Sequence, residues 1–210
     1  MKLSDVEAAR CSIDQGYDGF FDFVEVGRIG NQRIVRRESC KWLGIIDEFD
    51  NILLPLIYDK LTPKGYGVET IIANEDCELC GLYGTNDKKI IFPAIYDAIY
   101  PVLNKFWCMR NRQWKLMTSE CETIWHLPSN TLPLDHDKYV CILRKTDNNL
   151  RIEVLDDKYN HSQRRLRDVA HGSDIQNRIK ITSRYCNLIL YSDIYGNVIY
   201  SNININDIIL

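Results

Sequence analysis

A Cys-x-x-Cys pair, Cys77 and Cys80, is the first feature of this sequence that suggests chemistry. This spacing occurs in redox motifs and in zinc sites, where thiolates act as nucleophiles or as metal ligands. A zinc site needs a second Cys or His pair at ligand spacing, and a redox pair belongs at the start of a helix that follows a strand. The sequence around residues 77–80 shows neither context. We therefore expect a structural role for both cysteines, and no metal or other cofactor.

The histidines form no catalytic pattern. Only His136 has acidic neighbours, Asp135 and Asp137, and on a strand such neighbours point to the opposite face. The sequence contains no Gly-rich phosphate loop, no Gly-x-Ser-x-Gly and no His-Glu-x-x-His. We therefore expect no catalytic residues and no enzymatic activity.

A basic cluster, Arg164, Arg165 and Arg167, is the sharpest charge feature, and His161 and His171 flank it. Guanidinium groups at this density can bind the phosphates of a nucleic acid or nucleotide, or an acidic partner. Several aspartates lie nearby in the sequence, and salt-screened surface charges usually contribute little. A solvated face is the favoured interpretation, and a binding site formed by these five residues is the alternative.

The composition is that of a folded globular chain. Of the 210 residues, 45% are hydrophobic and 26% are charged, and the formal net charge is -3. A net negative charge argues against a protein that coats nucleic acid, although it does not exclude a local basic patch. We find no signal-peptide pattern and no apolar run long enough for a membrane span, so we expect a cytoplasmic protein without membrane contact. The eight cysteines are expected to be reduced thiols.

One sequence phrase occurs twice, and it indicates the architecture that must position any site. Residues 52–61, ILLPLIYDKL, recur 38 residues later as residues 90–99, IIFPAIYDAI. A fixed period of 20 to 50 residues is typical of repeat proteins. Weaker copies come after it: Pro128 lies 35 residues after Pro93, and strand-like runs recur at residues 150–156 and 188–199. We predict five units of about 36 residues, with degenerate copies acting as caps at the ends.

Each unit has the pattern of β-structure. Residues 106–110 and 114–117 are short apolar or aromatic runs joined by a polar loop, which predicts a hairpin. We expect meanders of about three strands, with the proline of the phrase at the end of the third strand. Its tyrosine should pack on the core at a corner, and its aspartate should accept backbone N–H groups in the next turn. Helices are predicted over residues 4–11, from a capping box, and between residues 161 and 171.

Residues 42–59 resemble the WG (KWG) repeat found in many bacterial proteins, with Lys41-Trp42, Gly44, Asp47 and the Pro-x-x-Tyr-Asp ending of that family. The match departs from the family pattern where Leu43 separates Trp42 from Gly44 and where Cys80-Gly81 replaces Trp-Gly in the second unit. The resemblance implies an all-β repeat scaffold that binds or positions other proteins. A propeller-like ring and an open twisted row of units both fit the period.

These observations predict an all-β chain of tandem antiparallel meanders with a short N-terminal helix. We expect an N-terminal helix or cap over residues 1–15, well-matched repeats over 16–132 and degenerate repeats over 133–210, all in one continuous domain. The expected function is a non-enzymatic protein-interaction or scaffold module, such as a regulatory or inhibitory subunit of a larger bacterial assembly. The alternative is a nucleic-acid or nucleotide-binding protein that uses the Arg164, Arg165 and Arg167 cluster.

Overall fold

A computed structural model of the chain describes residues 23–38, 40–73, 77–146, 149–171, 179–183 and 188–203. These residues form antiparallel β-sheets and one helix, α2 (Gln163–His171). The all-β class predicted from the sequence is confirmed, and so is a helix within residues 161–171. None of the helical structure in this part of the chain is long and apolar enough to cross a membrane. The predicted helix over residues 4–11 and the cap over residues 1–15 lie outside the described residues.

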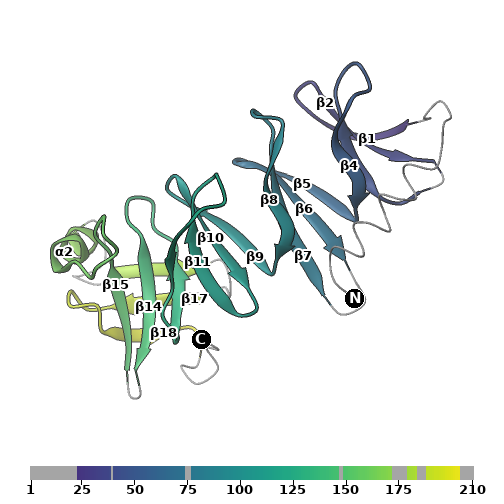
Figure 1. Cartoon of the computed structure of the whole chain (residues 1–210). Coiled ribbons are helices and arrows are strands. Elements are labelled where there is room, and N and C mark those ends of the chain that lie inside the picture. The colour runs from purple at the N-terminus through teal and green to yellow at the C-terminus, as the bar shows by residue number, and fades with distance from the viewer. Residues whose placement is uncertain are drawn as a thin grey trace. The chain divides into compact units, whose positions relative to one another are not determined.

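The chain divides into two compact units, residues 1–99 and 100–210. The first unit holds two four-stranded sheets in which strands adjacent in sequence are also adjacent in space (Figure 1). The first sheet consists of β1 (Phe23–Ile29), β2 (Gln32–Arg37), β3 (Leu43–Ile46) and β4 (Ile52–Tyr58). The second sheet consists of β5 (Lys60–Lys64), β6 (Gly67–Ala73), β7 (Glu78–Gly84) and β8 (Lys89–Tyr96).

The second unit contains the remaining three sheets, each again a meander. The third sheet consists of β9 (Ala98–Val102), inside which the division between the units falls, β10 (Lys105–Arg110), β11 (Gln113–Met117) and β12 (Thr123–His126). The fourth consists of β13 (Thr131–Leu134), β14 (Cys141–Thr146) and β15 (Asn149–Val154). The fifth consists of β16 (Ile179–Ser183), β17 (Leu188–Ser192) and β18 (Val198–Ser201). The hairpin predicted from residues 106–117 is confirmed as β10 and β11.

Each unit has an apolar core between its sheets. In the first unit, Ile45 and Leu54 of the first sheet pack in one cluster with Ile72 and Tyr83 of the second, and all four are buried. In the second unit, alternate residues of β14 and β15 share a cluster with β17 and with α2, which contributes Leu166. Period-two alternation along the strands thus places one face of each sheet in the core.

The repeated Tyr-Asp pair lies at the junction between sheets. Tyr58 ends β4 and is 3% exposed, so its ring packs on the core as predicted. Asp59, between β4 and β5, donates its N–H to the carbonyl of Ile71 at 2.8 Å, and its Oδ2 accepts the N–H of Ala73 at 2.8 Å. The aspartate was predicted to accept backbone N–H groups in the turn that follows; the N–H of Ala73 that it accepts belongs to β6 of the next sheet. The pair therefore ties the end of one sheet to the second strand of the next.

The prolines of the repeated phrase lie inside strands. Pro55 is in the middle of β4 and Pro93 is in the middle of β8, which corrects the prediction that they end a third strand. Both strands are the fourth and last of their sheets. An edge strand can hold a proline because one side of its backbone has no ladder to complete.

Each of the five sheets has a turn residue with a positive φ, at positions 50, 88, 121, 159 and 196. Four of these turns share one hydrogen-bond pattern, in which the positive-φ residue is the fourth. In four of the turns the N–H of the first residue donates to the carbonyl of the fifth, and the N–H of the fourth donates back to the carbonyl of the first. In the same four turns a side-chain oxygen of the first residue accepts the backbone N–H groups of the third and fifth; these first residues are Asp47, Thr118, Asp156 and Asp193.

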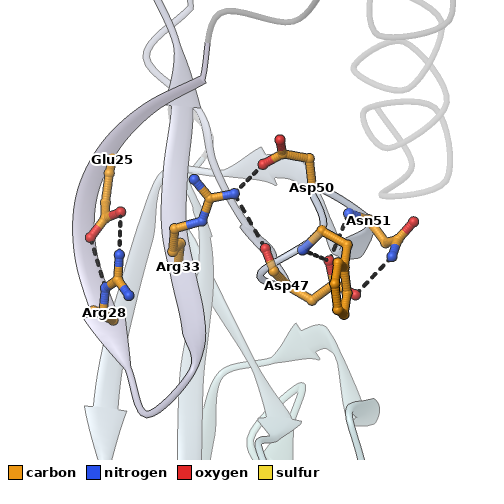
Figure 2. A network of polar contacts seen from close by, with 7 residues as sticks. Glu25, Arg28, Arg33, Asp47, Asp50 and Asn51 are labelled. Carbon is orange, nitrogen blue, oxygen red and sulfur yellow. Dashed lines mark hydrogen bonds and ion pairs between the residues drawn. The ribbon is translucent and has the colours of Figure 1, made fainter.

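The turn of the first sheet shows this network in full (Figure 2). Asp47 Oδ1 accepts the N–H groups of Phe49 and Asn51 at 2.9 and 2.8 Å, and its Oδ2 accepts the Asn51 side-chain amide at 2.8 Å. Arg33 on β2 donates to the carbonyl of Asp47 at 3.3 Å and pairs with the carboxylate of Asp50. The hydrogen bond from the Asn51 amide is the main cause that lowers the pKa of Asp47 below its usual value.

Glycines occupy the point where the third strand of a sheet bulges beside the fourth. Between the pairs Cys80 with Tyr96 and Leu82 with Phe92 the register of β7 shifts, and Gly81 lies at that shift. A Cβ on Gly81 would lie 2.6 Å from Thr70 Oγ1 and 2.7 Å from two backbone atoms of β8. In the first sheet, Leu43 pairs with Tyr58, just as Cys80 pairs with Tyr96 in the second. Cys80 therefore corresponds to Leu43, and its predicted equivalence to Trp42 is wrong.

We expect Gly81→Ala to lower the free energy of unfolding by about 2 kcal/mol or more, because the new methyl group overpacks against backbone. Gly65→Ala is the matched control, since a Cβ there meets no atom within 4 Å. It should change the free energy of unfolding by no more than about 0.5 kcal/mol. Urea unfolding of the two variants gives the comparison. Equal unfolding midpoints would contradict the tight bulge.

We expect Asp47→Asn to destabilise the fold at neutral pH, because the amide removes the charged acceptor. The pKa of Asp47 is lowered in the folded state, so its stabilising effect is present above the pKa of the unfolded chain. That effect is lost as the pH falls through the lowered folded-state pKa. Urea unfolding across acidic pH should therefore show the variant and the wild type converging at low pH. The exposed neighbour Glu48 serves as control, and Glu48→Gln should follow the wild type at every pH.

Candidate functional site

The predicted basic cluster lies on the first turns of α2. The helix begins after Ser162, whose carbonyl accepts the N–H of Leu166 at 3.0 Å and whose Oγ accepts the N–H of Arg165 at 3.3 Å. Leu166 and Val169 are buried in the core of the second unit, which fixes the orientation of the helix. Arg164 is exposed, and Arg165 is partly buried.

The structure places the flanking residues of this cluster unequally. His161 forms an isolated β-bridge with Leu155, next to β15, and its Nε2 lies 2.9 Å from Nε2 of Gln163. The pKa of His161 is lowered mainly by partial burial; the charge of Glu153 opposes this, and the charges of Arg151 and Arg144 are smaller causes that lower it. Arg167 and His171 belong to α2, and their side chains lie outside the described part of the chain.

Arg165 is held by three contacts on different segments. Its Nη2 lies 2.9 Å from Asp157 Oδ1, and its Nη1 donates to the carbonyl of Leu155 at 3.0 Å. The guanidinium also lies over the ring of Tyr139, 5.6 Å from the ring centre. The hydrogen bond to Asp157 is the main cause that raises the pKa of Arg165. Arg165 is thus a fixed part of the surface.

Two stacked pairs of aromatic rings occur in the second unit, and one of them includes the ring that Arg165 covers. The rings of Trp125 on β12 and Tyr159 stack nearly parallel, with 5.9 Å between centres and 12° between planes. Tyr139, the ring under Arg165, stacks with His136 at 5.5 Å. Trp125, Tyr139, Tyr159 and Arg165 are each partly exposed. We call these four residues the aromatic–arginine surface; Asp157 joins its two halves, since it lies two residues before Tyr159 and pairs with Arg165.

The turn between β15 and His161 positions Tyr159. Asp156 Oδ1 accepts the N–H groups of Lys158 and Asn160 at 2.8 and 2.9 Å, and the hydrogen bond from Asn160 is the main cause that lowers the pKa of Asp156. Tyr159 is the fourth residue of this turn and has a φ of 62°. A bulky residue is uncommon in this left-handed region, where the fifth sheet has Gly196. Such backbone strain is typical of functional positions.

Sequence reasoning missed Trp125, Tyr139 and Tyr159. The arginines were singled out because they lie close together in the sequence. The three rings come from separate segments, and their positions share no regular spacing in the sequence. One signal was present: Tyr159 comes three residues after Asp156, as Gly196 comes three residues after Asp193. Aligning the chain on the turns would have shown an aromatic residue at a position where glycine is favoured.

The Cys77 and Cys80 pair differs in exposure. Cys77 is exposed, whereas Cys80 is buried on β7, and desolvation is the main cause that raises the pKa of Cys80 to about 12. A reactive or metal-binding thiol needs a lowered pKa, so Cys80 is in the wrong environment for either role. Across the described residues, no three His, Cys, Asp or Glu side chains gather in a group that could hold a metal ion.

A scan of the sequence against models of known protein families gives no match, and a search of curated proteins gives no similar sequence. The geometry of the chain is therefore the basis for assigning it a function.

We expect Cys77 to react with an alkylating reagent first and Cys121 more slowly. Both side chains are exposed. Partial desolvation of the Cys121 thiol and the nearby charge of Glu120 nevertheless raise the pKa of Cys121, which lowers its thiolate fraction. Cys80 and Cys141, each with a pKa raised to about 12, should react only after unfolding. Peptide mass spectrometry after timed alkylation gives the order. Modification of Cys80 as fast as Cys77 in the folded protein would contradict the placement of β7.

Proposed function

We propose that the protein is a non-enzymatic protein-interaction module built as a tandem array of WG-type units. The recurrence of a turn residue with a positive φ at positions 50, 88, 121, 159 and 196 supports the repeat interpretation, since the spacings of 38, 33, 38 and 37 residues agree with the period of the sequence. Repeat arrays commonly present extended binding surfaces. In this proposal the protein works in the cytoplasm as a regulatory subunit of a larger assembly.

The aromatic–arginine surface is the single observation that supports this function best. Tryptophan, tyrosine and arginine are the residue types that dominate the binding energy of protein interfaces. Here they are partly exposed and already ordered by stacking and hydrogen bonds. Preordered side chains lose little conformational freedom on binding, so more of their contact energy appears as affinity.

The charge balance of this surface favours a protein partner over a nucleic acid. Arg165, the arginine at its centre, is already paired with Asp157 at 2.9 Å. A paired guanidinium would release few counterions on contact with a phosphate backbone, so binding should depend weakly on salt. The nucleic-acid alternative, which uses Arg164, Arg165 and Arg167, predicts a steep salt dependence instead.

The test is Tyr159→Gly. Glycine adopts the positive φ of this position without strain, so the variant should fold at least as well as the wild type while it loses the ring. Cys121→Gly is the matched control, because it makes the same backbone change in the turn of the third sheet. A partner captured from a host extract with the wild type should be identified, purified and titrated against all three proteins.

We expect Tyr159→Gly to weaken binding by about thirtyfold, the effect of removing a typical hot-spot side chain. Cys121→Gly should bind like the wild type, and raising the salt from about 0.1 M to 0.5 M should change the affinity little. Unchanged binding by Tyr159→Gly would contradict the role of this surface. Nuclease-sensitive capture with a steep salt dependence would favour the nucleic-acid alternative.

A further inference from the structure

Two arginines face each other on the fourth sheet. Arg144 of β14 and Arg151 of β15 are directly opposite in the strand register, so their side chains leave the sheet on the same side. Leu143 and Ile152, the neighbours that alternate with them, point into the apolar core. Like charges directly opposite each other destabilise a sheet unless something neutralises them.

Glu153, two residues after Arg151 on β15, already pairs with one of these arginines. Glu153 forms a two-point contact with Arg144: Nε lies 2.9 Å from Oε1, and Nη2 donates to Oε2 at 3.1 Å. The Nε contact has the distance of an ion pair but lacks the direction of a hydrogen bond. The Glu153 side chain is only 12% exposed, whereas that of Arg144 is 38% exposed, so the carboxylate is the partner that is withdrawn from water. Such a paired geometry uses most of the acceptor capacity of the carboxylate toward one guanidinium.

Arg151 has no such partner. Its Nε is buried, and no hydrogen bond or ion pair joins its guanidinium to any part of the chain that the structure describes. Its backbone is fixed on both sides, by Arg144 in the ladder and by a β-bridge to Asn197. An unsatisfied buried donor is costly, and a bound anion that accepts a hydrogen bond from it would remove that cost.

His161 completes the charge cluster. Its imidazole lies within electrostatic range of Arg144, Arg151 and Glu153. The two guanidiniums and one carboxylate sum to a charge of +1 with a neutral imidazole, and to +2 when His161 is protonated. A phosphate group supplies negative charge that offsets this positive excess, and its oxygens match the planar fork of a guanidinium.

We propose that Arg151, with Arg144 and His161, forms a binding site for a phosphate dianion, either inorganic phosphate or a phosphate monoester. The site shares no residue with the aromatic–arginine surface, so it can be tested independently of the proposed protein interaction. Phosphate neutralises Arg151, satisfies its buried Nε and offsets the repulsion between the opposed arginines.

The first test is the effect of inorganic phosphate on thermal unfolding, at constant ionic strength set with chloride. Phosphate should raise the melting temperature of the wild type in a saturable way, because it binds only the folded chain. Arg151→Gln should lose about tenfold or more in phosphate affinity. Arg110→Gln, an exposed arginine at the end of β10, is the matched control and should respond like the wild type.

Arg151→Gln also separates a binding role from a structural one. In the absence of phosphate it should melt no lower than the wild type, because it relieves the repulsion with Arg144. A strong destabilisation there would show that Arg151 serves the fold and would overturn the proposal. An equal response of the Arg151 and Arg110 variants to phosphate would overturn it as well, since it would mark a general salt effect.

Glu153→Gln provides a gain-of-binding test. Removing the carboxylate leaves both guanidiniums unpaired, so the variant should be less stable than the wild type without phosphate and should gain more melting temperature when phosphate is added. A smaller gain than the wild type shows would contradict the site. Malonate serves as the carboxylate probe, and protection by malonate equal to that by phosphate would overturn the assignment to phosphate.

Discussion

A short side chain that accepts two backbone N–H groups is the interaction on which the rest of this structure depends. In the turn after β3, Asp47 binds the N–H groups of the third and fifth residues, which forces the fourth residue into the left-handed region. The register of the strands shifts just before this turn, at Ile46, and again before the corresponding turns of the third and fifth sheets. The turn therefore sets the pairing of the last strand in each of these sheets, and one bond pattern fixes where its side chains face.

Because the first residue fixes the backbone, the fourth residue is free to vary. Asp50 pairs with Arg33, Cys121 is exposed, and Tyr159 stacks on Trp125, although all three have φ values between 62° and 67°. The same scaffold position thus carries a charge, a thiol or an aromatic ring. Variation at a fixed backbone position allows a repeated fold to present a distinct surface in each unit.

The sequence period predicted the parts of the fold that local patterns determine. The recurrence of Pro-x-Ile-Tyr-Asp located β4 and β8 and the buried tyrosines, because alternation follows from the strand itself. It did not predict that Asp59 binds Ala73, since that bond joins two sheets and depends on how they pack. The recurring turns were harder still to find in the sequence, because their first residue is not always an aspartate. In the third sheet the acceptor is the hydroxyl of Thr118.

Long-range proximity explains why the candidate site was found only in part. Arg165 was identified from the density of arginines, but its partners, Tyr139 and the carbonyl of Leu155, reach it through the packing of α2 on the core. The pairing of Arg144 with Arg151 depends on the register of a hairpin, and a shift of one residue would place the two on opposite faces. Sequence patterns indicate which faces of the strands are apolar, but they indicate little about which charged side chains come into contact.

Both candidate surfaces arise where the fourth sheet departs from the pattern of the first three. In those sheets a fourth strand comes after the turn, whereas after β15 the pairing is reduced to the bridge between Leu155 and His161 before the chain enters α2. This change has two consequences. The helix carries Arg165 to the ring of Tyr139, and the shortened strand leaves His161 beside the arginines of β14 and β15. A fourth strand of full length would extend the ladder past His161 and replace the helix. The loss of regular pairing in this sheet is therefore the structural change from which both candidate surfaces arise.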